Sequence, residues 1–114
     1  MNVLMLVPDL FFASKIQTAA AHLGARVTPT TAARLAADCG EHRPDLVFVD
    51  LHAGADALEA VRRLKRDAAL ASVRVIGFYS HVDADTRRAA IEAGVDEAMP
   101  RSAFTVKLAA LLGG

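Results

Sequence analysis

DLVFVDLH, at residues 45–52, is the stretch that decides the fold. Its apolar run follows Pro44 and stops at Asp50, which predicts a strand over residues 45–49. A run that is apolar at successive positions, instead of at alternate ones, is typical of a strand buried on both faces of a parallel sheet. The stretch therefore indicates a central strand with polar residues at its carboxyl end.

Four more segments have strand character and alternate with helical patterns. The other predicted strands are residues 2–7, 25–28, 73–79 and 95–99. The predicted helices are residues 11–23, 31–39, 56–66, a fourth that begins at 83 or 85 and ends at 94, and a fifth from 102 onwards. Regular alternation indicates right-handed βαβ units. We therefore predict an α/β three-layer sandwich around a five-stranded parallel sheet, with the flavodoxin-like strand order 2-1-3-4-5.

Local signals predict where helices begin and end and which faces they bury. Gly24 should end the first helix, Thr31 should cap the second and Gly40 should end it, and Ser102 should cap the last. The basic positions 62, 63, 65 and 66 are predicted to form a solvated face of the third helix. Helical spacing predicts these core-facing residues: Phe12, Ile16, Ala20, Leu23, Leu58, Val61, Leu64, Phe104, Leu108 and Leu111.

Size and composition limit the classes of function. With 114 residues, the chain is predicted to be one domain over residues 1–114. Thirteen basic and thirteen acidic residues give no net charge, which argues against nucleic acid as the main partner. The N-terminal apolar run is too short to span a membrane, and a cytoplasmic setting is expected. The lone Cys39 is predicted to be a buried small hydrophobe, and no output domain is expected after the last helix.

Polar residues gather at the predicted carboxyl ends of the strands. Asp9 follows the first strand, Asp50 and His52 follow the third, Ser80 and His81 follow the fourth, and Arg101 follows the fifth. Ligands of such folds bind beyond these ends, near the point where strand order reverses. We therefore expect carboxylates, imidazoles, a hydroxyl and a guanidinium to meet on one rim.

Two segments resemble the receiver domain of two-component response regulators, a CheY-like domain. They are residues 46–51, which match the third-strand motif, and AGVD at residues 93–96, which is similar to the turn into the fifth strand. The resemblance covers essentially the whole chain. It implies that Asp50 is the phosphoacceptor and that Arg101 stands where the family has Lys. It also implies that Mg²⁺ is held by Asp9, Asp50 and the backbone carbonyl of His52, and that Ser80 and Arg101 contact the phosphoryl oxygens.

Several positions depart from the family pattern. The family's acidic pair reads Pro8-Asp9 here, so one carboxylate is missing. Arg101 keeps the positive charge of the Lys but not its compact ammonium geometry. Tyr79 and Ser80 both remain candidates for the Thr or Ser position, because counting from the two flanking motifs gives different answers. These departures favour a pseudo-receiver as the alternative to a phosphorylated module.

The resemblance implies a signalling module of a phosphorelay, not an enzyme. Its phosphodonor would be a histidine kinase or a phosphotransfer protein, and its output would be binding of a downstream protein partner. The alternative is a phosphorylation-independent module for protein interaction or homodimerisation. Asp9 and Asp50 could also serve as helix and loop caps. A third hypothesis places a transition metal on His52, His81 and the two aspartates, in a small hydrolase or a ligand-binding domain.

Overall fold

The computed structural model describes residues 1–80 and 84–113, in which five strands alternate with five helices. The strands are all parallel and follow the order β2-β1-β3-β4-β5, so the predicted fold class and strand order are confirmed. Within the described ranges, no helix is long and apolar enough to cross a membrane. The elements are β1 (Asn2–Leu6), α1 (Leu10–Leu23), β2 (Arg26–Pro29), α2 (Leu35–His42), β3 (Leu46–Asp50), α3 (Ala55–Arg66), β4 (Arg74–Tyr79), α4 (Ala84–Ala93), β5 (Glu97–Pro100) and α5 (Arg101–Gly113).

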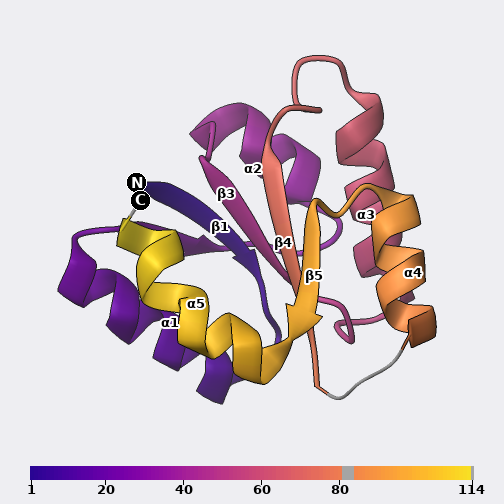
Figure 1. Cartoon of the computed structure of the whole chain (residues 1–114). Helices are drawn as coiled ribbons and strands as arrows, with labels where there is room; N and C mark the ends of the chain where they lie inside the picture. Colours follow the sequence, from indigo (N-terminus) through magenta and orange to yellow (C-terminus); the bar gives the residue numbers. More distant parts are fainter. Residues whose placement is uncertain (81–83, 114) are drawn as a thin grey trace.

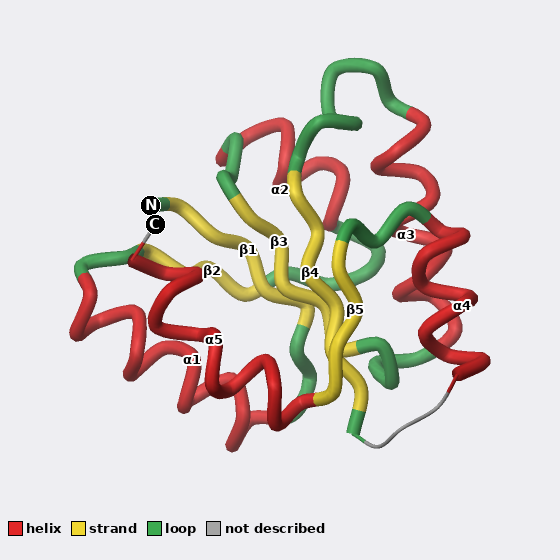
Figure 2. The backbone as a smooth tube through the Cα atoms, viewed as in Figure 1, coloured by secondary structure: helices red, strands yellow, loops and turns green. Residues whose placement is uncertain are grey.

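Helices cover both faces of the sheet. Figure 1 shows α1 and α5 on one face and α2, α3 and α4 on the other, and Figure 2 shows the strands as the layer between them. Alternate residues of each central strand serve the two sides: Phe48 packs toward α1 and α5, whereas Val47 and Val49 pack toward α2 and α3. This two-sided burial is the reason why β3 is apolar at each position before Asp50.

Four phenylalanines pack together between the sheet and the α1–α5 layer. The ring centroids of Phe78 and Phe104 lie 4.7 Å apart, those of Phe48 and Phe104 4.9 Å, and those of Phe12 and Phe78 5.0 Å. Such contacts add to the free energy gained from burial alone. The cluster joins α1, β3, β4 and α5 close to the carboxyl ends of the strands.

Three of the predicted helix limits are wrong, two of them at α2. The Thr31 hydroxyl accepts a hydrogen bond from the Arg34 N–H in a turn that precedes α2, and the helix itself begins at Leu35. Gly40 lies inside α2, which continues to His42 and ends at Arg43 with a left-handed backbone, φ 48°. The next residue is proline, which cannot continue a helix because it lacks the N–H donor.

Ser102 is also inside a helix instead of capping it, because α5 begins directly after Pro100. The apolar faces are mostly as predicted, with two exceptions: Leu23 is 44% exposed, and Leu112 is buried more completely than Leu111. Leu58 is partly buried against the core. Of the two predicted starts of the fourth helix, Asp83 lies outside the described residues and Asp85 lies in the first turn of α4.

Lys65 is not part of a solvated face, contrary to the prediction from the basic cluster. Its side chain is only 17% exposed, and its Nζ donates to the carbonyls of Ala71 and Val73 at 3.1 and 2.6 Å. The same Nζ contacts Asp96 Oδ2 at 2.9 Å, and that oxygen also accepts the Val75 N–H. Lys65 therefore ties the end of α3 to the starts of β4 and β5.

Replacing Lys65 by Met should lower the free energy of unfolding by about 1–3 kcal/mol, since the carbonyls and the carboxylate lose a charged donor. Arg66→Met is the matched control, because Arg66 is 69% exposed and reaches Glu59 at only 3.9 Å. The control should change the stability by less than about 0.5 kcal/mol. Urea unfolding followed by circular dichroism measures both, and equal effects would contradict the role given to Lys65.

Phe12 and Phe11 are neighbours with opposite environments, 6% and 87% exposed. Phe12→Ala should cost about 3–5 kcal/mol of stability, because it opens a cavity beside Phe78. Phe11→Ala should cost less than about 0.5 kcal/mol, because it removes no core contact. Thermal unfolding of the two variants gives the comparison, and a similar loss for both would contradict this orientation of α1.

Candidate functional site

Asp9 lies at the carboxyl end of β1 and caps α1. Its Oδ1 accepts hydrogen bonds from the N–H groups of Phe11 and Phe12 at 3.0 and 3.2 Å. This satisfies two of the free donors at the start of the helix and confirms the cap interpretation of Asp9. Its second oxygen, Oδ2, faces Arg101 across the rim.

Asp50 is the last residue of β3 and is only 7% exposed. Its Oδ1 accepts the backbone N–H of His52 at 2.9 Å, so it also caps the turn that follows the strand. The predicted loop-cap role of Asp50 is therefore confirmed. Because Oδ1 is engaged by the His52 N–H, Oδ2 is the oxygen of Asp50 that faces Arg101.

Arg101 brings the two carboxylates together. Its Nη1 lies 3.3 Å from Asp9 Oδ2, and its Nη2 lies 3.6 Å from Asp50 Oδ2. The guanidinium carbon also lies 4.4 Å from the centre of the Phe12 ring and 5.5 Å from that of Phe78. Stacking of this kind is favourable for a guanidinium. The aromatic cluster thus supports a cation held between two acidic groups, an arrangement we call the Asp9–Arg101–Asp50 bridge.

The helix cap and the bridge together lower the pKa of Asp9. The Phe12 N–H holds the pKa of the Asp9 carboxyl below its usual value of 3.8, and the Arg101 guanidinium acts in the same direction. Partial removal of water from the carboxyl has the opposite effect but does not outweigh them. Asp9 is therefore ionised at neutral pH.

The same geometry tests whether the rim suits a divalent cation. Carboxylate oxygens are the ligands that Mg²⁺ requires. Here both Oδ1 atoms accept backbone N–H groups, and both Oδ2 atoms contact Arg101. Asp9 and Asp50 would thus fit a divalent cation only with the guanidinium displaced. The ligand set of Asp9, Asp50 and the His52 carbonyl stays a prediction.

The two candidate hydroxyls at the end of β4 have different surroundings. Tyr79 is 5% exposed and packs in the core cluster on the side of α2, α3 and α4. Ser80 is exposed and directly follows the strand. Because Asp50 pairs with Phe78 in the sheet, Ser80 lies just beyond the level of Asp50 on the neighbouring strand. The phosphate-contacting role of Ser80 stays a prediction, and His81 lies outside the described residues.

An acidic cluster on α2 was missed by the sequence interpretation. Asp38, Glu41 and His42 each offer one ligand atom, and these atoms lie within 4.8 Å of one another. Their spacing of three and four residues puts them on one helix face, and this periodicity was the signal that could have found them. Asp38 already accepts a hydrogen bond from the Thr30 hydroxyl at 2.8 Å and contacts Arg34 at 3.4 Å.

Cys39, next to this cluster, is fully buried in the core, as predicted. Burial raises the pKa of its thiol to about 11, and the nearby Asp38 carboxylate adds to the effect. The thiol is therefore protonated at neutral pH, and Cys39 is a packing residue.

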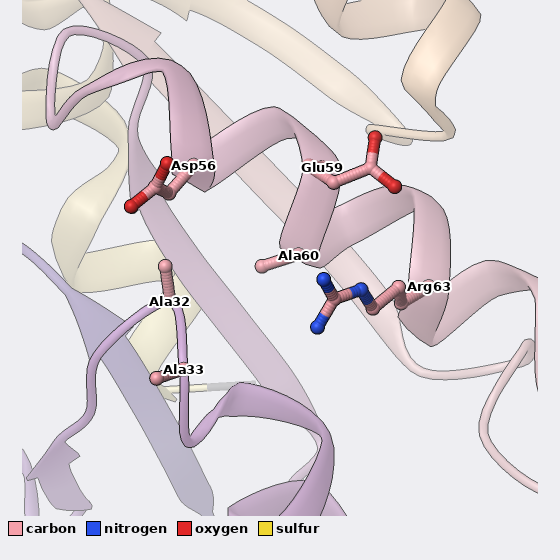
Figure 3. A pocket seen from close by; sticks show the side chains of 6 residues that line it. All are labelled: Ala32, Ala33, Asp56, Glu59, Ala60 and Arg63. Carbon is pink, nitrogen blue, oxygen red and sulfur yellow. The ribbon is translucent and has the colours of Figure 1, made fainter.

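A hollow of about 280 Å³ lies between α3 and the segment before α2. Figure 3 shows Ala32 and Ala33 on one side of it and Ala60 and Arg63 on the other, with Asp56 near Ala32 and the Glu59 carboxylate directed away. No sequence motif indicated this hollow. Its lining does not include the residues of the Asp9–Arg101–Asp50 bridge.

Asp9→Asn should make the stability less sensitive to acid, because Asn retains a capping oxygen but cannot titrate. The folded-state pKa of Asp9 is lowered, so its stabilising contribution is present above the unfolded-state pKa and is lost as pH falls through the folded-state value. Urea unfolding between about pH 5 and pH 2 should show a smaller decline for the variant than for the wild type. Parallel curves would contradict the charge-dependent role.

Comparison with solved structures identifies the fold. No protein-family model and no curated relative match the chain. Among solved structures, a receiver domain of a DNA-binding response regulator from Colwellia psychrerythraea 34H is 20% identical, with TM-score 0.80, covering 100% of this chain and 99% of that one. A response regulator from Hahella chejuensis is 14% identical, with TM-score 0.85, covering 97% and 91%. The Mn²⁺-bound form of response regulator Rcp1 is 17% identical, with TM-score 0.74, covering 99% and 89%. The chain has the CheY-like, flavodoxin-like fold of response-regulator receiver domains.

Proposed function

We propose that this chain is a receiver-type signalling module with Asp50 at the phosphoacceptor position and output by binding of a protein partner. The observation that carries the proposal is the position of Asp50. It ends the central strand β3 at the rim, within 3.6 Å of a cation that also contacts Asp9. A carboxylate that accepts a phosphoryl group needs nearby positive charge, because both reactants are anionic.

Each residue would contribute a defined interaction to phosphoryl transfer. The Asp50 Oδ2 would be the attacking atom, since its Oδ1 is held by the His52 N–H. Arg101 would pair with phosphoryl oxygens, and its planar guanidinium suits that role. Ser80 would donate its hydroxyl to the same group from the end of β4. The donor would be a histidine kinase or a phosphotransfer protein in the cytoplasm, and Mg²⁺ would supply further neutralisation of charge.

The surface beside the rim supports output through protein binding. Leu10 and Phe11 are 82% and 87% exposed, directly after Asp9. Adjacent large apolar side chains at the surface are typical of protein contacts. A partner that covers them would lie next to the acceptor position and could respond to its charge.

A phosphorylation-independent pseudo-receiver is the second candidate, and the Asp9–Arg101–Asp50 bridge favours it. The guanidinium already contacts both carboxylates and offsets part of their charge, and Pro8 stands where a further acidic group would be expected. In this case the fold would serve as an interaction or homodimerisation module, and the bridge would be structural.

Addition of Mg²⁺ and beryllofluoride, which mimics an aspartyl phosphate, should shift the amide NMR signals around Asp50, Ser80 and Arg101 saturably. Asp50→Ala should abolish these shifts. Asp45→Ala is the matched control, because Asp45 lies at the amino end of the same strand and accepts the Asn2 N–H. Shifts that persist in Asp50→Ala, or none in the wild type, would contradict the acceptor role and favour the pseudo-receiver.

A further inference from the structure

Arg101 occupies the place between the two acidic groups of the rim. The Oδ2 atoms of Asp9 and Asp50 face each other across its guanidinium, at 3.3 and 3.6 Å from the two terminal nitrogens. The two remaining oxygens of these carboxylates are engaged by backbone N–H groups. All four oxygens therefore have a donor or a cation as partner.

We propose that Arg101 is a built-in counter-ion that competes with divalent cations for Asp9 and Asp50. A cation from solution would need the same Oδ2 atoms and would meet the positive guanidinium at contact distance. The inference deepens the proposed function, because it concerns the same site. In receiver-type chemistry, a metal ion is implied to offset the charge of the acidic groups. Here the Arg101 side chain would take this role for Asp9 and Asp50.

Three features hold Arg101 at this place. It is the first residue of α5 and directly follows β5, so its backbone is fixed by two elements. Its guanidinium lies over the Phe12 ring, which restricts it to the rim side of the aromatic cluster. Its side chain is 32% exposed, less than that of Asp9 at 38%.

One hydrogen-bond donor of Arg101 is not used in these contacts. Its buried Nε has no hydrogen-bond partner among the residues that the structure describes. A guanidinium with an unused donor and two carboxylate contacts longer than 3.2 Å is held by charge and stacking more than by strong hydrogen bonds. Competition by a divalent cation is therefore an equilibrium that substitution of Arg101 can shift.

Mn²⁺ binding provides the test, without any phosphoryl mimic. Arg101→Gln keeps a polar side chain but removes the charge, and it should bind Mn²⁺ at least about tenfold more tightly than the wild type. Paramagnetic broadening of the amide signals of residues 9 and 50 measures the affinity and locates the ion. Arg74→Gln is the matched control, because Arg74 is also paired with a carboxylate, that of Glu97, but at the amino end of β4. It should leave the affinity unchanged.

A second substitution tests whether the additional Mn²⁺ affinity arises at Asp9 and Asp50. Asp9→Asn in the Arg101→Gln background should abolish it, since one of the two carboxylates is then absent. Arg101→Lys retains a cation and serves if Arg101→Gln does not fold. It should bind Mn²⁺ more tightly than the wild type, because the compact, strongly hydrated ammonium lacks the planar fork and the ring stacking that hold Arg101 between the carboxylates. The gain should be lost on Asp9→Asn.

Two results would overturn the inference. Equal Mn²⁺ affinity of the wild type and the Arg101 variants would show that guanidinium and metal do not compete. Binding in none of them would show that the two aspartates form no cation site. A wild type that fails to respond to beryllofluoride while Arg101→Gln gains Mn²⁺ binding would reject the acceptor role of Asp50 but support the counter-ion role of Arg101.

Discussion

Burial of both faces of the sheet is the constraint on which the rest of the structure depends. Residues 3–6 of β1 and residues 46–49 of β3 are at most 4% exposed. A strand in this position has no place for a charge except at its ends. Asp50 accordingly stands at the last position of β3, and Asp9 lies in the short segment between β1 and α1. Because the strands are all parallel, their carboxyl ends lie at a single edge of the sheet, where the charged groups meet.

At this edge the bridge combines electrostatic and aromatic contacts. Two carboxylates beside the ends of different strands would repel each other in a half-buried setting, and Arg101 offsets this repulsion while its guanidinium stacks on Phe12. Phe12 in turn belongs to the ring cluster that joins α1, β4 and α5. Core packing and the charges of the rim are therefore coupled through one side chain.

The fold could be predicted from the sequence because the hydrophobic periodicity and the alternating order of strands and helices determine it. The limits of α2 and α5 could not be predicted from the sequence. A glycine such as Gly40 can lie within a helix as well as end one, and Ser102 cannot cap α5 because that helix has already begun at Arg101. The solvated face predicted for the basic cluster was wrong for Lys65, whose partners lie in the loops before β4 and β5, where helical periodicity gives no information.

Within the site, Asp9, Asp50 and Arg101 were predicted to share one rim, and the structure brings them together. The contact of one guanidinium with both carboxylates depends on ångström-scale distances between residues far apart in the chain, 92 positions in the case of Asp9 and Arg101. No spacing rule predicts such distances. The α2 cluster of Asp38, Glu41 and His42 was not predicted, because it lies away from the strand ends at which this fold usually binds ligands. The metal and phosphate roles stay predictions.

The two outer strands have a consequence for self-assembly. β2 and β5 are four residues long, and each ends in proline, Pro29 and Pro100. Proline offers no N–H for a further strand, and a short edge gives little template for one. Growth of the sheet from one molecule into the next, the route toward fibrous aggregates, is disfavoured at both borders. Any pairing of two copies would be expected to use helical surfaces instead.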